Sequence, residues 1–261
     1  MLGMGFRQEM RDWCLDLFPH QFVEVAPENW IRKDLTPLKQ LGKPIAFHGV
    51  SLNLGGETPI DIEFLRLVRL AMDTLNVQFY SDHLAASGDA HQLYDLFPIA
   101  FTRQEAGRVA DRIKAVQDVL GCQMAIENSV YYTNVGDLSE LDFLNEVLER
   151  ADCLHLLDVN NFVVNDKNHH TGVDLTKLDW NRVTYVHIAG HEYSSRFDLY
   201  WDTHSAPAEP AVLELARDAY ARGKPILLEW DNAIPDQETY RNYLLELQQC
   251  FVKGFGTTSA A

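Results

Sequence analysis

Cysteine is scarce in this chain, and no two cysteines stand at a metal-binding spacing. Cys14, Cys122, Cys153 and Cys250 form no C-x-x-C pair, and they fall in or beside helical and strand-like patterns. We expect reduced, mostly buried thiols, which is typical of the cytoplasm. The absence of a thiolate cluster argues against a structural zinc site or an iron–sulfur centre.

Long apolar runs and an excess of basic residues are also absent. No stretch approaches the ~20 apolar residues of a membrane span, and no basic segment followed by an apolar run begins the chain. The 261 residues carry 38 acidic side chains against 22 Lys plus Arg, a net charge of −16. Because such a surface repels phosphate backbones and anionic membranes, we expect a soluble protein that binds neither nucleic acid nor membrane.

Strand-like runs alternate with amphipathic helical patterns along the chain, and 46% of the residues are hydrophobic. Strands are expected at 21–27, 44–50, 77–84, 123–129, 154–160, 183–190, weakly near 197–203, and at 225–231. The clearest helices are expected at 60–76, 102–121, 140–152, 210–223 and 236–253. Eight strands in alternation with helices predict an α/β fold, a single (β/α)8 TIM barrel over residues 1–253, with a disordered tail at 254–261.

Residues at the expected helix ends agree with this pattern. Thr102 stands three residues before Glu105, as in a capping box, and Pro210 suits the first turn of a helix. Gly121 and Gly223 follow helical patterns and suit C-caps.

Side chains that bind metals recur where the expected strands end. They stand in PIAFHGV, VQFYSDHL, MAIENS, LHLLDVNN, TYVHIAGH, YWDTH and PILLEWD. The nine candidates are His48, His83, Glu127, Asp158, Asn161, His187, Asp202, His204 and Glu229. If the strands are parallel and close into a ring, these residues converge on one mouth of the barrel.

A metal ion would offset the electrostatic cost of burying these groups close together. Buried carboxylates and histidines that lie close together repel one another or shift their pKa values unless a cation joins them. Imidazole nitrogen mixed with carboxylate oxygen suits zinc, manganese or iron rather than calcium. Nine ligands are too many for one ion, so Glu127 could bridge two ions, and Asn161, Asp202 and His204 could hold a third.

Taken singly, the candidates have simpler explanations. A lone strand-end histidine is often a hydrogen-bonded structural group, Asp158 and Asp202 could cap helices or turns, and Asn161 is a turn former. Glu229 ends an apolar strand, where an unpaired carboxylate is costly. The joint pattern favours ligation. Of the other histidines, His155 is expected to point outward, and surface or substrate-loop roles are expected for His20, His91, His169 and His170.

Seven segments, taken in order, resemble the family of multinuclear non-heme iron-dependent oxidative enzymes. They are HGVSLNLGG (48–56), SDHL (81–84), EN (127–128), LLDVNN (156–161), HIAGH (187–191), DTH (202–204) and LLEWD (227–231). Members of that family include the catalytic subunit of methanobactin biosynthesis and the enzyme that excises the cysteine β-carbon in 3-thiaglutamate biosynthesis. The family is similar to xylose isomerase and endonuclease IV in barrel and ligand layout. Asn161 stands where the nuclease pattern has a histidine, which weakens a third metal position.

The resemblance implies two to three iron ions of mixed valence, Fe(II) and Fe(III), with O2 as co-substrate. The implied ligand groups are His48, His83 and Glu127 for one iron; Glu127, Asp158, His187 and Glu229 for a second; and Asn161, Asp202 and His204 for the third. The residues expected to act in catalysis are His187, Asp82 and His191, and those expected to orient ligands are Asn128, Asn160 and Asp231.

The implied activity is the oxidation of a cysteine in a ribosomally made precursor peptide. APENWI (26–31) and the HGVSLNLGG segment place β-carbon excision, as in a 3-thiaglutamate-type pathway, ahead of oxazolone and thioamide formation. The resemblance also implies a small partner protein that presents the peptide, and hence a heterodimer.

Three other functions use a similar ligand set. A zinc-dependent phosphodiesterase of the endonuclease IV type would activate water, but needs a basic track that a charge of −16 disfavours. A sugar isomerase would use two divalent ions, yet no clear lysine accompanies a ligand strand. A non-catalytic metal-binding protein would leave the residues beside the ligands unexplained.

Overall fold

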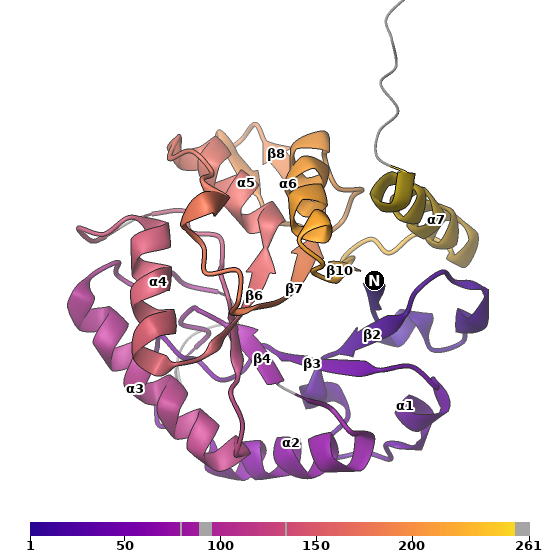
Figure 1. The fold of residues 1–261 in the computed structure, drawn as a ribbon, viewed down its shortest axis with the longest axis horizontal. Coiled ribbons are helices and arrows are strands. Elements are labelled where there is room, and N and C mark those ends of the chain that lie inside the picture. Colours follow the sequence, from indigo (N-terminus) through magenta and orange to yellow (C-terminus); the bar gives the residue numbers. More distant parts are fainter. Residues whose placement is uncertain (79, 89–95, 134, 254–261) are drawn as a thin grey trace, which may run out of the picture.

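The computed structural model describes residues 1–78, 80–88, 96–133 and 135–253. Eight parallel strands close into a barrel in the order β1-β10-β7-β6-β5-β4-β3-β2. Helices surround this barrel as a ring (Figure 1). The TIM barrel expected from the sequence is therefore confirmed, while the expected tail at 254–261 and His91 lie outside the described residues.

The element bounds follow the alternation of strands and helices. The strands are β1 Leu2–Gly5, β2 Phe22–Val25, β3 Ile45–Gly49, β4 Tyr80–His83, β5 Ala125–Glu127, β6 Leu154–Asp158, β7 Val183–Ile188, β8 Glu192–Ser194, β9 Leu199–Trp201 and β10 Ile226–Leu228. The α-helices are α1 Thr36–Gln40, α2 Ile62–Leu75, α3 Arg103–Leu120, α4 Glu140–Ala151, α5 Val159–His169, α6 Pro210–Ala221 and α7 Gln237–Lys253. Short 3-10 helices span Gln8–Met10, Leu15–Leu17, Pro27–Asn29 and Leu175–Lys177.

The sequence pattern missed one barrel strand and wrongly assigned another, so the expected number of barrel strands was still correct. The barrel contains β1, which the pattern did not reveal, because LGMG is short and half glycine. Gly3 is required there, since a Cβ atom would lie 2.4 Å from the ring of Phe22. The segment near 197–203 is not a barrel strand, because β9 pairs antiparallel with β8 in a separate two-stranded sheet.

The five expected helices are present, with ends within two residues of those expected. Thr102 accepts a hydrogen bond from the Glu105 amide, and Gly121 takes the left-handed conformation. The pattern missed α1 and α5, and α5 is rich in asparagine and β-branched residues, which are poor helix formers. Among the described residues, no helix is long and apolar enough to cross a membrane.

The barrel interior is built in two layers. The lower layer is an apolar cluster of Phe22, Ala46, Ala125, Leu156, Tyr185 and Leu227. Two residues further along each of these strands or just beyond it stand Glu24, His48, Glu127, Asp158, His187 and Glu229, all buried. Because side chains alternate along a strand, a step of two keeps each polar group on the inner face, one layer nearer the mouth.

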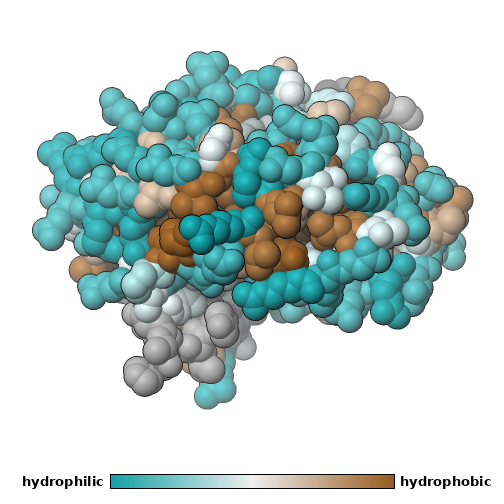
Figure 2. Space-filling model, turned by 90° about the horizontal axis from the view of Figure 1, so that it is seen from below, coloured by the Kyte–Doolittle hydropathy of each residue, from teal (hydrophilic) through white to brown (hydrophobic). Residues whose placement is uncertain are grey.

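The outer surface suits the acidic composition. The face seen in Figure 2 is mainly hydrophilic, with apolar side chains gathered across its middle. The helices cover the outside of the barrel and enclose the main hydrophobic core between themselves and the strands. The main hydrophobic core therefore lies outside the barrel wall, and the space within the wall holds the apolar layer and, nearer the mouth, the polar groups.

Candidate metal centre

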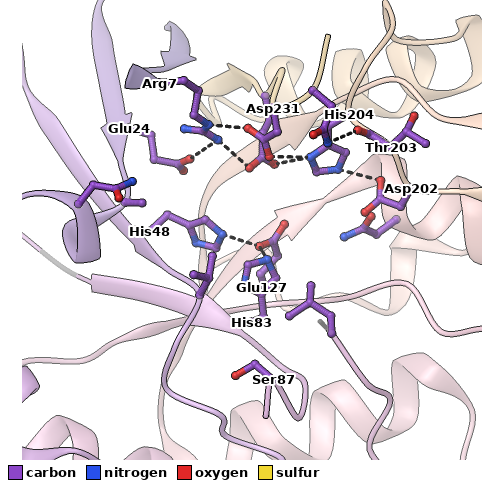
Figure 3. A pocket seen from close by; sticks show the side chains of 17 residues that line it. Arg7, Glu24, His48, His83, Ser87, Glu127, Asp202, Thr203, His204 and Asp231 are labelled. Atoms are coloured by element: carbon purple, nitrogen blue, oxygen red, sulfur yellow. Dashed lines mark hydrogen bonds and ion pairs between the residues drawn. The ribbon is translucent and has the colours of Figure 1, made fainter. Parts of the chain in front are cut away.

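A pocket of about 480 Å3 opens at the C-terminal ends of the strands. Seven of the nine ligand candidates line it: His48, His83, Glu127, Asn161, Asp202, His204 and Glu229. Asp158 and His187 lie at its base with no exposed surface. Figure 3 shows the labelled side chains converging on the pocket from separate strands and loops. The convergence expected from the sequence is therefore present.

Two compact ligand groups share one carboxylate. His48 Nε2 and His83 Nε2 lie 2.9 and 3.2 Å from Glu127 Oε2. The other oxygen, Glu127 Oε1, lies 3.2 Å from His187 Nδ1. His187 Nδ1 also lies 2.9 Å from Glu229 Oε2 and 3.9 Å from Asp158 Oδ2. Each group offers ligand atoms that all lie within 4.8 Å of one another, so Glu127 has the geometry of a bridge.

The third group differs from the one that the resemblance implies. His204, Glu229 and Asp231 bring ligand atoms within 4.8 Å of one another. Asp202 contacts the same histidine, with its Oδ1 atom 2.7 Å from His204 Nε2. Asn161 lines the pocket with a buried Oδ1 atom that has no hydrogen-bond partner. Asp231, expected only to orient ligands, therefore stands among the candidate ligands.

Buried polar atoms without a hydrogen bond fit metal ions at this place. Among the described residues, these atoms include His48 Nε2, Glu127 Oε2, Asp158 Oδ2, Asn161 Oδ1, His204 Nε2 and Glu229 Oε2. All but Asn161 Oδ1 lie at ion-pair distance from an oppositely charged side chain. An unsatisfied buried group costs about 1–3 kcal/mol, so a bound cation would satisfy these acceptors and nitrogens together. Nitrogen and oxygen donors in this mixture suit first-row transition metals.

Neighbouring residues fix which histidine nitrogen is available. Ser81 Oγ donates to the Phe47 carbonyl at 3.0 Å, so it must accept from His48 Nδ1, also at 3.0 Å. When the ring is neutral, its proton is therefore on Nδ1 and the lone pair of Nε2 faces the first ligand group. Glu24 Oε2 accepts from His187 Nε2 at 2.7 Å and from the Tyr185 hydroxyl at 2.6 Å, which leaves His187 Nδ1 facing the second group.

The charges of the site are strongly coupled in the protein without metal. Burial alone would lower the pKa of His48, but Glu127 and Glu24 raise that pKa to about 9. Burial would also lower the pKa of His187, and Glu24, Glu229 and Glu127 raise it well above its ordinary value. Burial would raise the pKa of Glu127, yet the histidines hold it well below its ordinary value. The imidazoles therefore hold protons that a bound cation would displace.

Two residues of the site were missed by the sequence reasoning. Glu24 is 1% exposed in β2, and a carboxylate alternating with Phe22 in the apolar run FVEV was a signal that could have revealed it. Arg7 lies just beyond β1, where Nη2 is 3.0 Å from Glu229 Oε1 and Nε is 2.5 Å from Asp231 Oδ1. No signal pointed to Arg7, because the strand before it was not recognised.

His191, expected to be catalytic, lies outside the pocket lining and is linked to it by other side chains. Lys167 Nζ donates to His191 Nε2 at 2.8 Å, so His191 Nδ1 carries the proton that it donates to Asn160 Oδ1 at 2.7 Å. Asn160 Nδ2 in turn donates to Asp202 Oδ1 at 2.7 Å. Burial and Lys167 lower the pKa of His191. This chain of hydrogen bonds holds Asp202 at the pocket wall.

Asp82, also expected to be catalytic, points away from the pocket. Its carboxylate accepts hydrogen bonds from the Tyr80 hydroxyl and from the Leu52 amide at 3.2 Å. Strand alternation explains this, since Ser81 and His83 take the inner face of β4. Asp82 therefore anchors the loop after β3, and this geometry favours a positioning role.

Asn128 joins β5 to β6 behind the ligands. Its Oδ1 atom accepts from the Asp158 amide and from His155 Nε2, both at 3.0 Å, and its Nδ2 atom donates to the Asp158 carbonyl. Asp158 also caps α5 by accepting from the Asn161 amide at 2.7 Å through Oδ1. Because only Oδ1 is used for the cap, Oδ2 is left for the second ligand group, so the observed cap is compatible with the predicted ligand role of Asp158.

Comparison with known proteins places the chain in a family. Residues 1–251 match the RiPP precursor modification enzymes MbnB/TglH/ChrH, which act on ribosomally made peptides. A UPF0276 protein of Shewanella sediminis is 40% identical over 260 residues, covering 95% of this chain and 93% of the relative. A UPF0276 protein of Neisseria meningitidis serogroup C is 39% identical over 249 residues, covering 89% of each chain.

Solved structures share the fold at low identity. A xylose isomerase domain-containing protein from Salmonella typhimurium superposes with a TM-score of 0.64 at 9% identity, over 96% of each chain. Endonuclease IV from Thermus thermophilus superposes with a TM-score of 0.62 at 14% identity, over 97% of this chain and 98% of the nuclease. These likenesses support the barrel, and the sequence match over residues 1–251 shows that the chain belongs to the family of RiPP precursor modification enzymes MbnB/TglH/ChrH.

Proposed function

We propose that this chain is an O2-dependent oxidase that holds two to three iron ions and modifies a cysteine of a ribosomally made precursor peptide. The observation that carries the proposal is the carboxylate of Glu127, which faces two ligand groups at the base of an open pocket. Iron would supply the redox chemistry that oxidation of a cysteine by O2 requires. Excision of the β-carbon is the first candidate outcome, and formation of an oxazolone with a thioamide is the second.

The protein's own residues hold and tune the centre. Glu24 and Ser81 orient His187 and His48, as the hydrogen bonds above describe. Arg7 balances the charge of Glu229 and Asp231 at the wall of the pocket. A cysteine thiol that entered this pocket would meet cations at its base and would favour its thiolate form, because a metal lowers the pKa of a coordinating thiol.

The pocket is less suited to the alternative functions. Among the described residues that line it, Arg7 is the only Arg or Lys, and its guanidinium is already engaged by two carboxylates. A phosphodiester backbone would meet few free cations there. No described lysine lines the pocket to serve a sugar isomerase.

The proposal also includes a small partner protein that presents the peptide, as a heterodimer in the cytoplasm. Its test is to purify the chain with each short cysteine-containing peptide encoded beside its gene, and to follow peptide mass after exposure to O2. Iron-loaded protein should change the mass of the cysteine peptide, and zinc-loaded protein should not. Stoichiometric zinc with no iron after iron-supplemented expression, together with activity on zinc alone, would contradict the proposal.

His187→Ala provides the sharpest variant for this assay. Turnover should be abolished, because the loss removes a buried ligand candidate, while the fold should persist on its strand pairing and on the apolar layer below. His169→Ala is the matched control, since His169 contacts the Tyr131 carbonyl and does not line the pocket. Circular dichroism, iron content and peptide mass would be compared, and wild-type turnover by His187→Ala would remove His187 from the site.

A further inference from the structure

A second pocket of about 520 Å3 adjoins the metal centre. We call it the side pocket, and we call the pocket of the metal centre the central pocket. Asn29, at the end of a 3-10 helix after β2, lines both. The side pocket extends over the segment after β1 and over α1. Together the two spaces greatly exceed what one cysteine side chain occupies, because a pocket of 300–1,000 Å3 suits a whole drug-sized ligand.

The lining of the side pocket combines an apolar base with polar and cationic groups. The rings of Phe6 and Trp30 stack with centroids 6.3 Å apart. Asn29 contributes an amide, which can both donate a hydrogen bond to a peptide carbonyl and accept one from a peptide N–H. Arg11 and Lys33 add two cations against one acidic residue, Asp34.

This positive balance stands out in its surroundings. The whole chain carries a net charge of −16, and another pocket that borders the segment after β1 has Glu9, Asp231 and Asp236 in its lining and no described Arg or Lys. Arg11 is paired only weakly, with Nε 3.6 Å from Asp12 Oδ1 and both side chains largely exposed. Such a contact is worth at most about 1 kcal/mol, so the guanidinium remains available to another carboxylate.

We propose that the side pocket binds the segment of the precursor peptide next to the modified cysteine, and that Arg11 and Lys33 select an acidic residue in that segment. An extended chain advances about 3.3 Å per residue, so a peptide with its cysteine in the central pocket passes Asn29 and reaches the two cations within a few residues. This inference rests on the proposed function for the class of ligand.

The test uses binding rather than turnover. Fluorescein-labelled peptides share one cysteine in a Gly-Ser background and carry a pair of Glu, Ser or Lys residues about three positions away. Each of the three is made in two versions, with the pair before or after the cysteine. Their affinities for the full chain are measured by fluorescence anisotropy. The wild-type protein should bind the Glu peptide roughly fivefold more tightly than the Ser peptide, which corresponds to about 1 kcal/mol for a partly exposed ion pair.

Two charge-reversal variants make the result specific. Arg11→Glu combined with Lys33→Glu should remove the preference for Glu and favour the Lys peptide. Arg103→Glu combined with Lys114→Glu changes the net charge equally on the exposed side of α3, away from both pockets, and should leave the preference unchanged.

The outcomes separate this inference from the proposed function. Equal affinity of wild type for the three peptides, or an equal effect of the control variant, overturns selection by Arg11 and Lys33 and leaves the oxidase proposal standing. If no peptide binds at millimolar concentration, the side pocket is not a peptide site. Turnover of the precursor by iron-loaded protein then decides the oxidase proposal separately.

Discussion

Glu127 is the residue on which the arrangement of the centre depends. One of its oxygens faces His48 and His83, and the other faces His187. A carboxylate in this position can hold two cations at a fixed separation. The amide of Asn161, in contrast, is a neutral ligand candidate at the edge of the centre.

Glu127→Gln should therefore lose more metal than Asn161→Ala. The first change removes a charge and one anionic oxygen shared by two groups, while the second removes a single weak donor. Metal content per chain, measured after identical loading and desalting, gives the comparison. Equal iron in the two variants would count against the bridging role.

Glu24→Ala should weaken metal binding roughly 10–100-fold, which is typical when the partner of a ligating histidine is lost. In the wild type, Glu24 accepts the proton of His187 Nε2 in a hydrogen bond, which leaves Nδ1 to bind a metal. Without Glu24, the proton can move to Nδ1 and compete with the metal there. Competition with a chelator measures the affinity. Glu24→Gln should recover part of it through its carbonyl, and Tyr185→Phe, which removes the other partner of Glu24, should have a smaller effect. Unchanged affinity in Glu24→Ala would show that His187 is oriented by other contacts.

At the scale of elements, the packing of β3 against β4 explains the first glycine of HGVSLNLGG, Gly49. A Cβ atom on Gly49 would lie 1.8 Å from the Tyr80 hydroxyl and 2.8 Å from Asp82 Oδ2. That hydroxyl and carboxylate are the pair that anchors the loop through Leu52. The close approach of β3 and β4 therefore depends on the missing side chain.

Gly49→Ala should destabilise the protein by about 1–3 kcal/mol, as overpacking of a buried site does. It should also lower metal content, because His48 directly precedes Gly49 in β3 and His83 ends β4. Gly107→Ala in α3 is the control, since its Cβ would meet only the flexible tip of the Arg150 side chain of α4. That change should be neutral or stabilise by about 0.5–1 kcal/mol. Thermal unfolding measures both, and equal melting temperatures would refute the packing argument.

The elements also show what the sequence could predict. Ligands at strand ends were found because apolar runs ending in His, Asp or Glu are visible without a structure, as in PILLEWD. Arg7 was missed because β1 has no β-branched residue to mark it as a strand. Asp82 was given a catalytic role because adjacency in sequence does not reveal which face of β4 a side chain takes. The partners of His191 are Lys167 and Asn160 of α5, and Asn160 in turn contacts Asp202 in a loop, so no local sequence pattern connects His191 to the pocket.

At the scale of the whole molecule, metal uptake should depend on pH. Without metal, the pKa of His48 is raised to about 9, so this imidazole is protonated at neutral pH and a cation must displace the proton. Apparent affinity should rise as pH increases from 6 to 8, by up to about tenfold per pH unit for each proton displaced. The part of this rise that is due to His48 should level off above the pKa of His48.

Anaerobic calorimetric titration with Mn2+ in two buffers of different ionisation enthalpy measures the protons released, because the heat of binding then includes the heat of protonating the buffer. The His48→Gln variant should release fewer protons than wild type at pH 7. Binding that is independent of pH over this range would show that the imidazoles are already neutral before metal arrives.

The two layers inside the barrel impose a constraint on how this chain can change length. Each polar group of the centre stands two positions beyond an apolar one in or just after the same strand, as Glu127 does after Ala125 and His187 after Tyr185. Inserting or deleting one residue within a strand would turn its ligand out of the barrel and bring a neighbour in, because a slip of one position exchanges the two faces. Insertions in the connections between elements cause no such exchange. Related chains with an intact centre should therefore vary in length in their loops and keep the spacing within every strand.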